Sequence, residues 1–179
     1  MRKGEKTALS FRPALPAEAE LVCGFVNAAY RGESAKRGWT TEADILGGQR
    51  TDPEKVLEMI QEPGSRIELA YDENALAGCV HLKKEPAGSC YLGMLTVDPG
   101  KQAAGLGKRL LERSEELAKE WGCSRMRMTV IHLREELLAY YERRGYRRTG
   151  AAEPFPEHDP RFGLPKVKGL TFLELVKAL

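Results

Sequence analysis

Residues 97–108 carry the pattern in this chain that most directly indicates chemistry. Their sequence, VDPGKQAAGLGK, leads from an apolar stretch typical of a strand, through small residues, into a helical pattern. Such a connection presents unpaired backbone N–H groups at the positive end of a helix, and small side chains leave those groups open to a ligand. The segment therefore predicts a cradle for a phosphate or pyrophosphate group.

Two common nucleotide-binding motifs do not fit this segment. A Walker-type loop would need glycine where Gln102 stands, and Ser or Thr where Arg109 stands. A dinucleotide fingerprint would need a third glycine in place of Leu110. The pattern that does fit is Gln-x-x-Gly-x-Gly over 102–107, which resembles the acyl-CoA pyrophosphate loop of the GCN5-related N-acetyltransferase (GNAT) superfamily.

A second segment, 141–146, strengthens this resemblance. Its sequence, YERRGY, is similar to the superfamily pattern Tyr-Glu-[Lys/Arg]-x-Gly-[Phe/Tyr], and it follows the glycine loop after one helix and one strand. The chain departs from the superfamily at one position. An asparagine often stands seven residues before the tyrosine and contacts the cofactor, whereas this chain has Arg134 there.

The elements that must position these residues follow from hydrophobic periodicity. Alternating or apolar runs predict strands over 9–12, 66–71, 75–82, 90–97, 125–131, 146–149 and 170–176. Helical spacing, with proline and acidic residues at the starts and glycine at the ends, predicts helices over 16–30, 53–62, 106–121 and 133–144. Gly93 inside a strand predicts a bulge or a close approach. Residues 31–50 and 151–169 are predicted to be long loops.

The resemblance covers nearly the whole chain, because the order of the predicted elements also matches. It implies an α/β fold with a mixed, mostly antiparallel sheet flanked by helices. A V-shaped split would separate strands 90–97 and 125–131 at the centre of this sheet. The length of 179 residues fits one domain over 1–179, since domains have roughly 100–200 residues.

The resemblance also implies a donor, acetyl-CoA, and where it would bind. Its pantetheine arm would lie in the split beside the end of strand 90–97, and its pyrophosphate would lie on the loop and helix start that follow. The implied cofactor-binding residues are Leu95, Thr96, Val97, Gln102, Ala103, Ala104, Gly105, Leu106, Gly107 and Lys108. No metal is implied.

Direct acetyl transfer to an amine needs a base, a donor for the tetrahedral oxyanion and a proton source for the leaving thiolate. Tyr141 matches the superfamily's tyrosine in the last role, because a phenol is protonated at neutral pH; core packing on an amphipathic helix is the alternative. Strand 90–97 contains no Asp, Glu or His. The base therefore stays open, between a water chain and the side chains of His81, Glu68, Glu42 and His132.

The two long loops are expected to border the acceptor pocket. Trp39 and Glu42 in the first loop, and Arg161 and Phe162 in the second, are the candidate acceptor-binding residues. The alternatives are purely structural: the first loop would pack around Trp39, and the second would be a surface connection between the last two strands. The acceptor expected on this basis is the amine of a small molecule or an amino group.

Composition excludes several other classes of protein. Lys and Arg number 28 against 26 Asp and Glu, and a net charge of +2 does not favour nucleic-acid binding. Apolar runs are too short for a membrane span, and polar residues interrupt the place of a signal sequence. Four scattered cysteines favour reduced thiols in the cytoplasm over disulfides or a zinc site. A homodimer, an acyl-CoA sensor without activity and a nucleotide-binding protein stay open as alternatives.

Overall fold

A seven-stranded sheet with the strand order β1-β3-β4-β5-β6-β9-β7 forms the centre of the molecule. We describe it from a computed structural model that covers residues 8–31 and 42–179, without the side chains of 102–104. Neighbouring strands are antiparallel except β5 and β6, which are parallel. The strands are β1 (Leu9–Pro13), β3 (Ser65–Asp72), β4 (Ala75–Glu85), β5 (Ser89–Val97), β6 (Arg125–Ile131), β7 (Arg147–Pro154) and β9 (Thr171–Ala178). The predicted mixed, mostly antiparallel α/β fold is confirmed.

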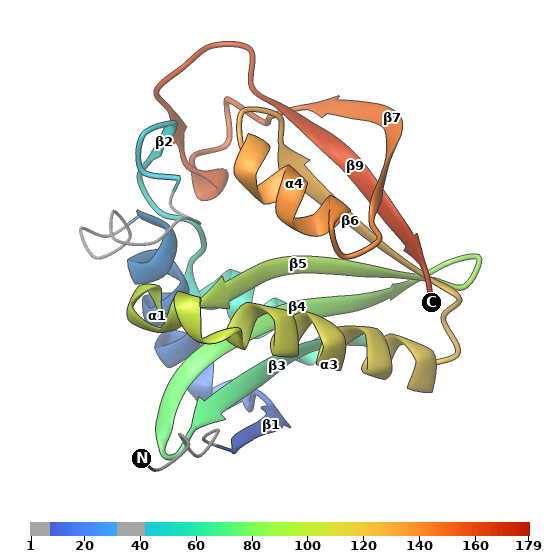
Figure 1. Ribbon diagram of the computed structural model, residues 1–179. Helices are drawn as coiled ribbons and strands as arrows, with labels where there is room; N and C mark the ends of the chain where they lie inside the picture. The colour runs from blue at the N-terminus through green and yellow to red at the C-terminus, as the bar shows by residue number, and fades with distance from the viewer. Residues whose placement is uncertain (1–7, 32–41) are drawn as a thin grey trace, which may run out of the picture.

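Helices cover both faces of this sheet (Figure 1). Side chains alternate along β3, so Leu69 packs in one core cluster with α1 and α2, whereas the adjacent Ala70 packs in the other with α3 and α4. The helices are α1 (Ala19–Arg31), α2 (Pro53–Gln61), α3 (Leu106–Glu120) and α4 (Glu135–Glu142). Within the described residues, no helix is long and apolar enough to cross a membrane.

The sheet opens between β5 and β6, as the resemblance implied. The two strands pair over three residues each, Ser89–Tyr91 with Arg125–Arg127, and then diverge (Figure 1). The pairing of β4 with β5 shifts register between Cys79 and His81, and Met94 of β5 has a φ of 54°. Such a bulge, an extra residue in one strand, bends that strand and increases its twist. The bulge lies in the part of β5 that is no longer paired with β6.

The bulge lies beside Gly93, where the sequence predicted either a bulge or a close approach, and both are present. A Cβ at Gly93 would stand only 2.7 Å from a ring carbon of Tyr91. Real Cβ atoms do not come that close to another atom, so the ring can lie against this strand only because the residue is glycine.

The predicted loop over 151–169 is wrong at its start and contains a short strand, whereas its predicted end agrees with the start of β9. β7 continues to Pro154, past a register shift between Arg148 and Ala152, and a second short strand, β8 (Leu164–Pro165), pairs with β2 (Leu46–Gly47). Every residue of β7 is exposed, so the strand shows no hydrophobic alternation. A strand of two residues is likewise too short to show any period.

Candidate functional site

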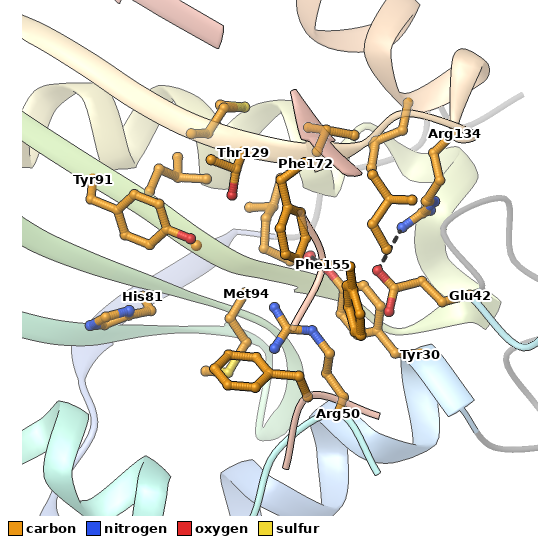
Figure 2. Close-up of a pocket in the computed structure, with 18 of the residues that line it drawn as sticks. Tyr30, Glu42, Arg50, His81, Tyr91, Met94, Thr129, Arg134, Phe155 and Phe172 are labelled. Atoms are coloured by element: carbon orange, nitrogen blue, oxygen red, sulfur yellow. Dashed lines mark hydrogen bonds and ion pairs between the residues drawn. The ribbon is translucent and has the colours of Figure 1, made fainter. Parts of the chain in front are cut away.

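A cavity of about 390 Å³ lies where β5 and β6 diverge (Figure 2). Its walls include Leu92–Leu95 of β5 and Arg127–Ile131 of β6, with His81 of β4 alongside. Tyr30 of α1 and Tyr141 of α4 also line it. The volume falls within the range of small-molecule sites. The split that the fold creates is therefore a cavity of the size that small-molecule sites have, and not merely a gap between strands.

The glycine loop connects β5 to the start of α3. A 3-10 turn, Pro99–Ala104, ends at Gly105, whose φ of 74° is a left-handed conformation that glycine adopts without steric cost. The first N–H groups of α3 have no partners inside the helix, so they can bind an anion. Lys101 holds the carboxylate of Asp72 at 2.6 Å. The backbone, more than this lysine, is thus available to a phosphate.

Gly107 keeps the start of α3 close to its neighbours. A Cβ there would stand 3.2 Å from the Tyr140 hydroxyl and 3.7 Å from the Val97 side chain. Lys108 is exposed and lies 3.7 Å from the carboxylate of Glu112. The side chains of Gln102, Ala103 and Ala104 lie outside the described part of the chain.

The end of β5 connects the loop to the cavity. Leu95 lines the cavity, and its carbonyl accepts a hydrogen bond from the Tyr30 hydroxyl. Thr96 is buried, and its hydroxyl donates to the carbonyl of Met94 at 2.9 Å. Leu106 is buried in the core beneath the helix start. Of these residues, Leu95 is the one that faces the cavity.

Tyr141 is both a core residue and a cavity residue. Its ring packs edge-on against Tyr140 and Tyr146, with centroids 5.4 and 5.8 Å away, while the residue also lines the cavity. Burial raises the pKa of the Tyr141 phenol far above its usual value of 10. The hydroxyl is therefore protonated throughout the physiological range and can donate a proton or a hydrogen bond.

Two of the four side chains named as candidate bases line the cavity, and two do not. Glu68 is fully buried elsewhere, in ion pairs with Arg66 at 2.6 Å and Arg113 at 3.3 Å. His132 accepts a hydrogen bond from the Thr171 backbone at 3.2 Å. Neither residue is part of the cavity wall.

His81 and Glu42 are the two candidate bases that reach the cavity. His81 lies 2.8 Å from the Ser65 hydroxyl, and burial lowers its pKa from 6.5 to about 4, so the imidazole is neutral at pH 7. Glu42 is held between Arg31 at 2.8 Å and Arg134 at 3.3 Å. His81 is thus free of strong ion pairs, whereas Glu42 is bound on both sides.

Three arginines line one end of the cavity; Arg31 and Arg50 were not identified from the sequence, and Arg134 was noted there only as a departure from the superfamily pattern. They come from α1, from the segment before α2 and from the start of α4. No local sequence pattern links such distant positions. The one indication in the sequence was arginine at position 134, where the superfamily often has asparagine.

The second predicted loop contributes aromatic side chains. Phe155 and Phe162 of this segment line the cavity. Phe172 of β9 also lines it, with its ring centroid 5.4 Å from that of Phe155. Arg161 points away into solvent, with its side chain 59% exposed and 3.6 Å from Asp159. Trp39 lies outside the described residues.

Neither a metal nor a thiol nucleophile is apparent in the described part of the chain. No group of His, Cys, Asp and Glu side chains among those residues could hold a metal ion. All four cysteines are free and buried, and burial raises the pKa of the Cys79 and Cys90 thiols to about 12. These two thiols are protonated at neutral pH and are poor nucleophiles.

Comparisons with known proteins agree with this geometry. The family model described as "Acetyltransferase (GNAT) family" matches residues 30–146, while no curated protein sequence matches the chain. Among solved structures, an IAA acetyltransferase from Bacillus cereus is similar at a TM-score of 0.69 and 14% identity, covering 96% of this chain and 100% of that one. A ribosomal-protein-alanine N-acetyltransferase from Brucella melitensis is similar at 0.69 and 18%, covering 95% and 99%.

A third similar structure contains a ligand. It is a protein from Salmonella typhimurium solved with its cofactor acetyl-CoA, with a TM-score of 0.67 and 19% identity, covering 96% of this chain and 94% of that one. At these identities the likeness of all three structures shows the fold.

Proposed function

Because the chain belongs to the acetyltransferase (GNAT) family, we propose that it moves an acetyl group from acetyl-CoA directly to the amine of a small molecule or to an amino group. The observation that carries this proposal is one continuous arrangement. Leu95 near the end of β5 and Tyr141 of α4 line the same cavity, and β5 leads directly into the glycine loop and the start of α3.

The residues present fit acetyl-CoA as the donor. Gly105 leaves open space around the loop, with no atom within 4 Å of where a Cβ would stand, and Gly107 leaves no side chain over the first turn of α3. The backbone of 102–108 would hold the pyrophosphate, and the diverging edge of β5 at Leu95 would hold the pantetheine arm. The thioester supplies the activated acetyl group.

Residues of the chain would then protonate the leaving sulfur and stabilise the oxyanion. Tyr141, protonated because it is buried, would give a proton or hydrogen bond to the leaving sulfur. A backbone N–H near the Met94 bulge would stabilise the oxyanion, since the bulge frees strand groups from the ladder.

The amine must lose its proton before it attacks. For a lysine-like amine with a pKa near 10.4, this costs about 4–5 kcal/mol at pH 7. His81 is the better acceptor of the two cavity candidates, because Glu42 is held by two guanidinium groups. With a pKa of about 4, His81 would hold the proton briefly and pass it to water.

The four buried, free cysteines support the further proposal that the protein works in the reducing cytoplasm.

Two measurements on the same preparation test the proposed function. Calorimetric titration with acetyl-CoA, and with ATP and NAD as controls, should show binding of acetyl-CoA alone. Release of free thiol from acetyl-CoA should then depend on an added amine, with the acetylated amine confirmed by mass. Binding without thiol release for any amine would indicate a sensor. Binding of the nucleotides instead would overturn the assignment.

A further inference from the structure

One end of the cavity holds more positive charge than its own carboxylate can neutralise. Three arginines, Arg31, Arg50 and Arg134, line this end together with Glu42. Glu42 accepts from Arg31 at 2.8 Å and from Arg134 at 3.3 Å. Buried charges are costly unless they are paired and hydrogen-bonded. Arg31, Arg134 and Glu42 are buried, whereas Arg50 is partly exposed. Among the described residues, this end of the cavity therefore carries net positive charge that another anion would neutralise.

Arg31 is fully occupied within the protein. Besides Glu42, its guanidinium donates to the backbone carbonyls of Gly47 at 3.1 Å, Gln49 at 2.8 Å and Phe162 at 3.3 Å. These bonds hold the chain segments around the cavity in place. Arg31 is accordingly a structural element of the wall and has little capacity left for a ligand.

Arg134 has unused hydrogen-bonding capacity. Its side chain is only 8% exposed, and Nη1 reaches Glu42, but Nη2 is buried and has no hydrogen-bond partner among the residues that the structure describes. A guanidinium carries five N–H donors, and leaving some of them unpaired in a buried position is unfavourable. Because Arg134 lines the cavity, a ligand oxygen there could pair with this nitrogen.

Arg50 is the second guanidinium with free capacity. It lies over the Tyr30 ring, 5.6 Å from the centroid, and it has no ion-pair partner in the part of the chain that the structure describes. Figure 2 shows its head group pointing into the cavity from one side, with Arg134 and Glu42 on the other. The same tyrosine bonds to the Leu95 carbonyl, so Arg50 lies near the wall where transfer would occur.

The other charges around the cavity do not change this balance. Arg127 is paired with Glu85 at 2.8 Å and with Glu174 at 3.3 Å. The remaining lining carboxylate, Glu153, is exposed on β7. The unsatisfied positive charge is therefore confined to the end that holds Arg50 and Arg134.

We propose that the acceptor is a small amine that also carries an oxyanion, a carboxylate above all, and that Arg50 and Arg134 bind this group. The inference rests on the proposed acetyl transfer and names its substrate class. Arginine suits the role because its planar fork matches a carboxylate. The aromatic wall of Phe155 and Phe172 would hold the apolar part of the acceptor.

A matched panel of amines tests this proposal. Each carboxylate, with one to three carbons between amine and carboxylate, is compared with its carboxamide and with the amine that lacks the group. Leucine, leucinamide and isoamylamine form one such set. The comparison is conservative, because an amide lowers the pKa of a neighbouring amine and so favours the neutral, attacking form. We expect kcat/KM for the carboxylates to be at least about 10-fold higher.

Variants assign the preference to the two arginines. Arg50→Gln should lower kcat/KM for carboxylates by about 10- to 100-fold, the effect of losing a charge-assisted hydrogen bond, and change that for carboxamides by less than about threefold. Arg134→Lys should act in the same direction and keeps the ion pair to Glu42. Arg125→Gln removes an exposed arginine outside the cavity and is the matched control, with no change expected.

Several outcomes would overturn the inference and leave the proposed function intact. Equal kcat/KM values for neutral amines and carboxylates would refute it, and so would a carboxylate preference that survives both variants. A protein that binds acetyl-CoA but acetylates none of the carboxylates also refutes it. If Arg134→Lys raises the KM for acetyl-CoA alone, Arg134 belongs to the donor site instead. Failure to bind acetyl-CoA is a different result and refutes the acetyltransferase proposal itself.

Discussion

Protonation of the buried His81 side chain should lower the free energy of unfolding as the pH falls into the mildly acidic range. The imidazole is buried on β4, and burial lowers its pKa from 6.5 to about 4. The unfolded chain therefore binds this proton more tightly than the folded protein does. The contribution of neutral His81 is fully present above pH 6.5 and is lost progressively as the pH falls from 6.5 to about 4. The variant His81→Gln removes the titrating group.

The size of the effect follows from the two pKa values. With 6.5 in the unfolded chain and about 4 in the folded protein, linkage gives a loss of about 2 kcal/mol in the free energy of unfolding between pH 7 and pH 5. The carboxylates with lowered pKa values, Glu18, Glu62 and Glu85, affect stability mainly below this window, because their ordinary pKa is 4.5.

Urea unfolding followed by circular dichroism at pH 7, 6 and 5 measures this loss. The wild-type protein should lose about 2 kcal/mol more than His81→Gln over that range. His158→Gln, at an exposed position, is the matched control and should follow the wild type. Loss of the hydrogen bond to Ser65 would lower the free energy of unfolding of His81→Gln equally at the three pH values. The comparison therefore uses only the change in that free energy with pH. Equal pH slopes for His81→Gln and the wild type would refute the reasoning.

Three further predictions concern the site itself. Gly107→Asp adds bulk and negative charge beside the first turn of α3, so calorimetry should show acetyl-CoA binding at least about 10-fold weaker in a protein that is still folded by circular dichroism. Tyr141→Phe keeps the ring packing but removes the proton, so kcat should fall by roughly 10²-fold with little change in donor affinity; near-full turnover would leave the residue a purely structural role. Replacing both Arg161 and Phe162 with Ala should raise the acceptor KM and leave the acetyl-CoA KM unchanged. Phe162, which lines the cavity, should account for most of that rise, and parallel changes in both KM values would contradict it.

The features that could be predicted from the sequence are those that are local in the chain. The glycine loop over 102–107 and the pattern that begins at Tyr141 are each contiguous, and most of the long strands and helices show their own period over many residues. The exposed strand β7 is the exception. The central bulge was indicated by a single glycine and lies one residue further along, at Met94.

The arginine cluster could not be predicted, because it exists only through tertiary contacts. Arg31 and Arg134 meet at Glu42 across 11 and 92 residues of chain, and each is an ordinary charged residue in its local context. The sequence also could not distinguish among the candidate general bases. Glu68 is buried away from the cavity, and its position depends on tertiary packing that no local pattern shows.

The short pairing of β5 with β6 also has a mechanical consequence. Three residue pairs form a joint, braced on one side by the ion pair between Arg127 and Glu85. From Tyr91 to the end of β5 at Val97 the strand extends about 20 Å, so a rotation of about 5° at the joint displaces its far end by roughly 2 Å. Because β5 is paired with β4 as far as Val97, such a rotation would carry the two strands together. We expect a substitution at Glu85, which lies at the joint and does not line the cavity, to change the width of the cavity.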